Sequence, residues 1–169
     1  LSTPDLGVGL PICINELVVA NDRSLDVEAN TPDWIELHNP TASDLSLTGW
    51  SISDDIDEPA RHRLASELVV PAGGYLLLYA DANPEAGSQH LSFKLGVDGE
   101  TLLLTAPNGH QNQLIYPALE EDIAALRTTD CCAGQDCWTY DWFGTPGASN
   151  IDLTQINLDE QILLETGSS

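Results

Sequence analysis

The stretch from Asp33 to Asp55, DWIELHNPTASDLSLTGWSISDD, carries the clearest structural signal in the chain. Its first half alternates, with Ile35 and Leu37 on one face and polar side chains on the other, and this period of two predicts a β-strand. Pro40 ends the strand because proline has no N–H to donate to a sheet ladder. A second strand is predicted over residues 45–53. The stretch therefore indicates a pair of strands joined by a polar bend.

The rest of the chain repeats this pattern of short strands and turns. Gly49 interrupts the second strand and indicates a bulge or a close backbone approach. Glycine, proline and asparagine separate the later apolar runs, and Asp-Gly and Asn-Gly pairs favour tight hairpins. Only residues 118–126 have some helical character. Further strands are predicted over residues 6–14, 14–20, 63–70, 74–80, 91–95, 100–105 and 111–116. This spacing is typical of an all-β sandwich.

The charge balance restricts the classes of partner. The 169 residues include 5 Lys and Arg against 27 Asp and Glu, which gives a net charge of −22. Such a surface repels phosphate backbones and anionic lipids, so nucleic-acid binding and membrane insertion are not expected. The hydrophobic content of 42% is ordinary for a globular domain. The acidity fits either simple solvation or the binding of hard divalent cations.

Four cysteines indicate the compartment. Cys13, Cys131, Cys132 and Cys137 are an even number, which suits disulfides. A bridge between the adjacent Cys131 and Cys132 would be strained, so we expect one of them to pair with Cys137 and the other with Cys13. A zinc site with four thiolates is the alternative, although the usual paired CxxC spacing is missing. Disulfides would place the protein in an oxidising, extracytoplasmic compartment. The chain starts at Leu1, as a mature secreted chain would after removal of a signal peptide.

Several segments together resemble the lamin-tail domain. They are INELVVAND at 14–22, the opening stretch at 33–55, VVPAGGYLLLYA at 69–80, FKLGVDGETLLLTAPNG at 93–109 and WFGTPGASN at 142–150. The resemblance covers residues 12–150 in the order found in the family. It implies an immunoglobulin-like β-sandwich, which in bacterial members is typically exported. It also implies architectural roles for Trp34 and Trp50 as fold anchors, and it supplies no catalytic residues. The cysteine cluster and the two terminal segments depart from the family.

The sequence offers one modest metal candidate and no catalytic motif. A loop carries four carboxylates in five residues, and a calcium ion prefers six to eight such oxygen ligands; these residues are Asp54, Asp55, Asp57 and Glu58. The alternative is that the aspartates simply end a strand. The loop with Asp22, Asp26 and Glu28 is a weaker candidate. The four histidines, His38, His62, His90 and His110, are scattered, and we expect them at the surface or rim. We therefore expect no enzymatic activity and, at most, a calcium cofactor.

The two termini carry alternating apolar residues beyond the predicted sandwich. In the N-terminal arm, residues 1–11, these are Leu6, Val8 and Leu10; in the C-terminal extension, residues 151–169, they are Ile156, Leu158, Ile162 and Leu164. Each segment could complete the sheet of its own domain or act as a linker. An extended segment could also add to the sheet edge of another subunit, and a head-to-tail contact that does not close forms a filament.

These observations predict an all-β, immunoglobulin-like β-sandwich over residues 12–150 with extended N- and C-terminal strands or arms. The expected function is that of an extracellular or cell-surface structural subunit that binds copies of itself by exchange of terminal strands. The alternative is a secreted adhesion or binding module for carbohydrate or protein, with calcium as a candidate cofactor. An accessory domain of a hydrolase is a third and weaker interpretation.

Overall fold

In a computed structural model of the chain, the structure describes residues 10–134 and 137–150. Within these ranges the fold is built almost wholly from strands. In chain order they are β1 (Cys13–Val18), β2 (Asp33–His38), β3 (Leu45–Ser46), β4 (Ser51–Ser53), β5 (His62–Arg63), β6 (Val69–Val70), β7 (Tyr75–Ala80), β8 (Gly99–Thr105), β9 (Gln111–Pro117), β10 (Ile123–Arg127) and β11 (Trp138–Trp142), with a short 3₁₀ helix η1 (Pro84–Ala86) after β7. The predicted arms, residues 1–9 and 151–169, lie outside the described residues.

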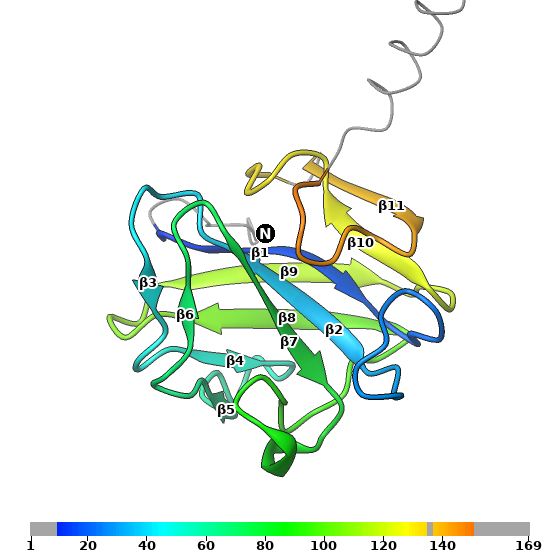
Figure 1. Cartoon of the computed structure of the whole chain (residues 1–169), viewed down its shortest axis with the longest axis horizontal. Coiled ribbons are helices and arrows are strands. Elements are labelled where there is room, and N and C mark those ends of the chain that lie inside the picture. The colour runs from blue at the N-terminus through cyan, green and yellow to red at the C-terminus, as the bar shows by residue number, and fades with distance from the viewer. Residues whose placement is uncertain (1–9, 135–136, 151–169) are drawn as a thin grey trace, which may run out of the picture.

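The strands form two main antiparallel sheets that pack face to face (Figure 1). One has the order β11-β10-β1-β2-β7, and the other has the order β5-β4-β8-β9. β3 and β6 form a separate two-stranded ribbon. β1, the first strand of the described residues, therefore lies at the centre of the larger sheet, between β2 and β10, which follows it by about a hundred residues. This architecture confirms the predicted β-sandwich.

The main core lies between the two sheets. Ile35 and Leu37 of β2 project into it, as their alternation predicted, and Trp50 packs there with only 4% of its surface exposed. Leu102 and Leu104 of β8 face them from the opposite sheet. Burial of these aliphatic and aromatic side chains is the main term that stabilises a sandwich of this size.

A second apolar cluster covers the outer face of the larger sheet. Trp34 is fully buried there against Val18, Ala124 and Leu126. Its indole Nε1 donates to the hydroxyl of Ser24 at 3.2 Å, so the loop after β1 covers this face. Both predicted anchors are therefore buried, Trp34 on the outer face of the larger sheet and Trp50 in the core between the two sheets. At β1 and β2 the larger sheet is covered on both sides, which is why neither strand contains an exposed residue.

Several predicted strands have different boundaries in the structure. The strand predicted over residues 45–53 divides at Gly49, whose φ of +81° turns the chain from β3 into β4. The strand predicted over residues 63–70 divides into β5 and β6. Residues 91–95 form no regular strand; around this segment the chain makes only isolated bridges, between His90 and Tyr79 of β7 and between Lys94 and Asp81.

The prediction of helical character over residues 118–126 is wrong. Residues 123–127 form β10, which pairs with β1 on one side and β11 on the other. The alanines and leucines of this segment favour a helix locally, but Ala124 and Ala125 are buried on opposite faces of the sheet. Tertiary packing therefore overrides the local preference. β11 was not predicted at all.

Candidate functional site

Two glutamates are buried side by side on the outer face of the larger sheet. Glu16 of β1 and Glu36 of β2 are direct neighbours in the strand register, and neither side chain reaches solvent. Both are covered by residues 143–150, here called the strap, which follows β11. Thr145 donates its backbone N–H to Glu16 Oε1 at 2.9 Å and its hydroxyl to Oε2 at 3.0 Å. Gly147 donates its backbone N–H to Glu36 Oε2 at 2.7 Å.

Asp130 connects the glutamate pair to the end of the strap. Asn15 donates from its amide nitrogen to Glu36 Oε1 at 3.1 Å and to Asp130 Oδ1 at 3.0 Å. Asp130 also accepts the hydroxyl of Tyr75 at 2.6 Å and the backbone N–H of Asn150 at 3.0 Å. The three carboxyl groups therefore form one network that joins β1, β2, β7 and the strap.

The two glutamates have strongly perturbed protonation. Burial raises the pKa of Glu16 to about 8, and the charge of Glu36 adds to this effect, although both bonds from Thr145 oppose it. Burial likewise raises the pKa of Glu36 to about 7 against the bonds from Asn15 and Gly147. For Asp130 the balance is reversed: burial would raise its pKa, but the donors led by Tyr75 lower it. Perturbed carboxyls of this kind occur at catalytic sites, but a substrate cannot reach a pair with no exposed surface.

Gly144 allows the strap to lie this close to the glutamates. Its φ is +65°, and a Cβ atom at this position would overlap the carboxylate of Glu16. The strap motif T-P-G-A-S-N is therefore a cover for two buried acids. The alternation in β2 placed Glu36 on the polar face. The strap motif was visible in the sequence, but no sequence pattern linked it to the glutamates.

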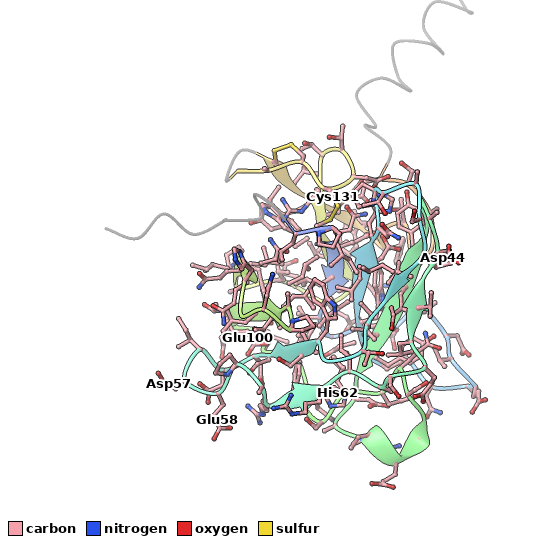
Figure 2. All side chains as sticks on the ribbon, turned by 90° about the vertical axis from the view of Figure 1, so that its left-hand side faces the viewer. Asp44, Asp57, Glu58, His62, Glu100 and Cys131 are labelled. Carbon is pink, nitrogen blue, oxygen red and sulfur yellow. A yellow bond between two sulfur atoms is a disulfide. The ribbon has the colours of Figure 1, made fainter. Side chains whose placement is uncertain are left out.

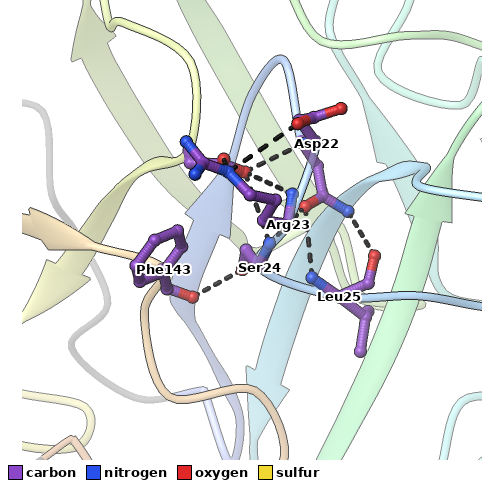
Figure 3. Close-up of polar contacts among 7 residues, drawn as sticks. Asp22, Arg23, Ser24, Leu25 and Phe143 are labelled. Atoms are coloured by element: carbon purple, nitrogen blue, oxygen red, sulfur yellow. Dashed lines mark hydrogen bonds and ion pairs between the residues drawn. The ribbon is translucent and has the colours of Figure 1, made fainter.

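A second acidic group lies at the turn after β1 (Figure 3). Asp22, Glu121 and Asp122 place carboxylate oxygens within 4.8 Å of one another, the one such grouping found in residues 10–134 and 137–150. However, Asp122 Oδ1 already accepts the backbone N–H groups of Asp22 at 2.8 Å and Arg23 at 2.9 Å. Burial would raise the pKa of Asp122, but these bonds and Arg23 lower it. Asp122 is thus an anchor for the turn and needs no cation.

The four carboxylates of the predicted calcium loop point in different directions and do not surround a common position. Asp57 and Glu58 project from the tip of the loop, away from the body of the domain (Figure 2). Asp54 instead forms an ion pair with Arg61, with Nη1 of the arginine 2.8 Å from Oδ1 of the aspartate. Asp55 accepts a hydrogen bond from the backbone N–H of Asp57 at 2.9 Å. The four carboxylates do not converge on a common point within the described residues. Calcium binding here remains a prediction that this geometry does not support.

The histidines occupy four unrelated environments. His38 is buried, which differs from the expected surface position; its Nδ1 lies 3.0 Å from the carbonyl oxygen of Gly74, and its ring stacks on Tyr75. His62 is half-buried and accepts the backbone N–H of Ser92 at 3.1 Å. His110 is exposed. His90 pairs with Asp81 beside a cleft, described below.

The cysteines form two disulfides. Cys13 at the start of β1 is bonded to Cys131, and Cys132 is bonded to Cys137. No cysteine is free, so the zinc alternative is excluded. The structure resolves which of the adjacent cysteines takes which partner. The first bridge ties β1 to the loop that carries Asp130, and the second closes a small loop before β11.

β11, the strand that leads into the strap, carries exposed apolar side chains and has one free side. β11 pairs only with β10, so within the described residues its other side has no ladder partner. Tyr140 and Trp142 share one face of this strand and are 49% and 55% exposed. Phe143, which follows, is 41% exposed and lies under the guanidinium of Arg23. β10 and β11 lie at the periphery, beyond the last strand of the smaller sheet (Figure 1).

The predicted self-assembly residues are mostly outside the described residues. Leu6, Val8, Ile156, Leu158, Ile162 and Leu164 all lie there. Leu10 is described, and it packs against the main core of its own domain.

The two sheets packed face to face define an immunoglobulin-like β-sandwich. Comparison with protein families identifies the family to which this sandwich belongs. The lamin tail domain model matches residues 9–116, more than half of the chain, and the protein belongs to this family. The strap and β11 lie beyond the matched residues. No curated protein and no solved structure matches the chain. The described part of the chain contains no helix with the length and hydrophobicity required to cross a membrane.

Proposed function

We propose that this protein is an extracellular structural subunit that binds copies of itself by exchange of terminal strands and so forms a filament or surface assembly. The observation that carries the proposal is the free side of β11, an edge strand with two half-exposed aromatic side chains. Edge strands with unpaired N–H and C=O groups accept further strands unless charge or a covering segment prevents it. The two disulfides support an oxidising compartment.

Charge favours the N-terminal arm as the donated strand. Asp5 is the one charged residue in positions 1–11, whereas positions 151–169 carry Asp152, Asp159, Glu160 and Glu165 and no basic residue. Because each subunit has a net charge of −22, a nearly neutral donor meets less repulsion from its acceptor. Leu6 and Val8 share one parity and would lie beside Tyr140 and Trp142 across the ladder. Aromatic–aliphatic pairs of this kind contribute about 0.2–1 kcal/mol each.

The test is assembly of the full chain and four variants, followed by light scattering and negative-stain electron microscopy. We expect filaments or large particles from the full chain, and monomers after deletion of residues 1–9 or after Trp142→Ser. Ile56→Ser is the matched control, because Ile56 is also a large exposed apolar residue, at 62%, but lies far from β11 in the chain. It should assemble normally, as should the deletion of residues 151–169.

Three results would contradict the proposal. The full chain could stay monomeric at all concentrations, or both the deletion of residues 1–9 and Trp142→Ser could assemble normally. Loss of assembly on deletion of residues 151–169 alone would keep strand exchange but overturn the N-terminal arm as the donor. Circular dichroism of each variant separates a lost contact from a lost fold.

A further inference from the structure

A large polar cleft lies at the end of the sandwich where β7 terminates. It has a volume of about 790 Å³, within the range of roughly 300–1,000 Å³ that is usual for small-molecule sites. One wall is the loop before β2, from Val27 to Asp33, and the other is the segment from Asn83 to His90 that includes η1. The end of β7, with Tyr79 and Asp81, forms the floor.

The wall formed by residues 83–90 is held at both ends. Tyr79 of β7 donates its backbone N–H to the carbonyl of Gln89 and accepts the N–H of Leu91, each at 2.8 Å. Ala82 donates its backbone N–H to the carbonyl of Phe93 at 3.1 Å. Backbone hydrogen bonds therefore hold both ends of the loop of residues 83–90 against β7 and the residues that flank the loop. The cleft is preformed and needs no ligand to create it.

Several polar groups at this cleft are in no hydrogen bond or ion pair within the described part of the chain. The side chain of Asn83 makes no hydrogen bond to η1, and the half-buried Tyr79 lines the cleft. Lys94 is in none of the described ion pairs. The His90 Nδ1–Asp81 Oδ2 contact of 2.7 Å fixes the ring and leaves Nε2 for another group. The cleft thus offers both donors and acceptors.

Tyr79 and His90 also provide an aromatic corner. Their ring centroids are 5.0 Å apart, and the ring planes are inclined by 59°. Aromatic faces pack well against the C–H groups of a ligand whose other side is polar. A lipid would find too few apolar side chains here, because the lining is mainly amide, hydroxyl and charged.

The charges in the cleft decide between ligand classes. Lys94, the single lysine of the chain, lines the cleft together with Glu28 and Asp33, and its charge helps to stabilise the ionised form of Asp33. No excess of positive charge is available for an anion, and the net charge of −22 repels polyanions. A neutral ligand rich in hydroxyl groups satisfies the donors and acceptors without this penalty.

We propose that this end cleft is a binding site for a neutral saccharide, with a sugar ring packed on Tyr79 and His90 and its hydroxyls bonded to Asn83, Lys94 and His90 Nε2. The site is distant from β11 in strand order, at the opposite edge of the larger sheet, and does not depend on self-association. The protein would then be able to attach its assembly to a glycan surface.

The test is a titration of the full chain followed by NMR chemical-shift changes, with cellotriose, maltotriose and triacetylchitotriose as neutral probes. Trigalacturonate is the acidic comparison. We expect one or more neutral probes to shift the backbone amide signals of Ser88, Gln89 and Lys94, and trigalacturonate to shift them less. The double variant His90→Ala/Lys94→Ala should weaken that binding at least tenfold.

Arg63→Ala/His110→Ala is the matched control, since it removes one basic residue and one histidine from exposed positions outside the cleft. It should bind as the unmodified chain does. The proposal is overturned if no neutral probe shifts the cleft signals, if trigalacturonate binds more tightly than all of them, or if the His90/Lys94 variant retains full affinity. Asn83→Ala, which changes an exposed side chain, gives the same comparison if the double variant does not fold.

Discussion

The most unusual residues in this molecule are the two buried glutamates. Glu16 and Glu36 are adjacent across β1 and β2, and each accepts backbone N–H groups from the strap. A pair of ionised carboxylates would repel each other in a site without solvent, and this repulsion is one reason why the pKa of Glu16 is raised. At neutral pH the pair therefore shares fewer than two negative charges. The strap is thus attached to the sheet through groups that titrate near neutrality.

The raised pKa of Glu16 predicts how stability depends on pH. Between its ordinary pKa of 4.5 and its folded-state pKa of about 8, the folded chain holds a proton that the unfolded chain has released. The free energy of unfolding should therefore fall as pH rises through this window, by up to about 1.4 kcal/mol per pH unit for one group. Glu16→Gln should flatten the slope because glutamine does not titrate. Urea unfolding at several pH values between about 5 and about 8 measures the slope of the free energy of unfolding against pH.

Glu67→Gln is the control for this prediction, since Glu67 is an exposed glutamate far from the strap. It should leave the slope of the free energy of unfolding against pH unchanged. An equal slope in the Glu16 variant and the unmodified chain would show that the proton is not held at Glu16.

At the scale of strands, sequence patterns predict those that alternate or carry long apolar runs. β2, β7, β8 and β9 were predicted within one or two residues, because one face of each is the core face. β10 was mistaken for a helix because alanine and leucine carry no strand signal. β11 was missed because its inner face, with Tyr140 and Trp142, extends beyond the smaller sheet and remains partly exposed.

Of the candidate sites, the sequence predicted disulfides but left the pairing open, since adjacent cysteines can exchange partners without changing the pattern. It gave no indication of the end cleft, whose walls come from loops separated by about fifty residues. It also placed Glu36 on the polar face of β2 without indicating that this face is buried. Covering both faces of one sheet is a property of the tertiary structure, which local alternation does not encode.

The two disulfides join elements at very different separations and should contribute unequally to stability. Cys13 and Cys131 are 118 residues apart in sequence, whereas Cys132 and Cys137 are 5 apart. In the chain-entropy description, the longer loop stabilises the fold by about 5 kcal/mol and the shorter by about 2 kcal/mol. We expect Cys13→Ser/Cys131→Ser to lower the free energy of unfolding more than Cys132→Ser/Cys137→Ser does.

Denaturant unfolding of the two double variants under oxidising conditions measures this difference. Each variant serves as the control for the other, because each removes one bridge and two cysteines. Equal losses, or a larger loss from the 132–137 pair, would contradict the prediction.

For the whole molecule, the net charge of −22 opposes any contact between copies. Added salt shortens the range of that repulsion, since the Debye length falls from about 30 Å at 0.01 M to about 10 Å at 0.1 M. Strand addition rests on main-chain hydrogen bonds and apolar contacts, which salt does not weaken. Subunit association should therefore be limited by electrostatic repulsion rather than by a lack of attraction.

We predict that raising sodium chloride from about 0.02 M to about 0.5 M increases the assembled fraction of the full chain. Light scattering at constant protein concentration measures it. Trp142→Ser is the control, and it should scatter weakly at every salt concentration. A decrease in assembly with salt would indicate that attraction between charged groups, and not an apolar edge, holds the subunits together.

β1 is the first strand of the described residues, yet its sheet is completed by nearly the last of them. It pairs with β10, and the side chain of Asn150 donates to the backbone carbonyl of Asn15 at 3.2 Å. The 118 residues between Cys13 and Cys131, at about 5–20 residues per second, take roughly 6–24 s to synthesise. For that time one side of β1 has no native partner. The nascent chain, rather than the folded subunit, is therefore the stage at which this protein is most exposed to incorrect pairing.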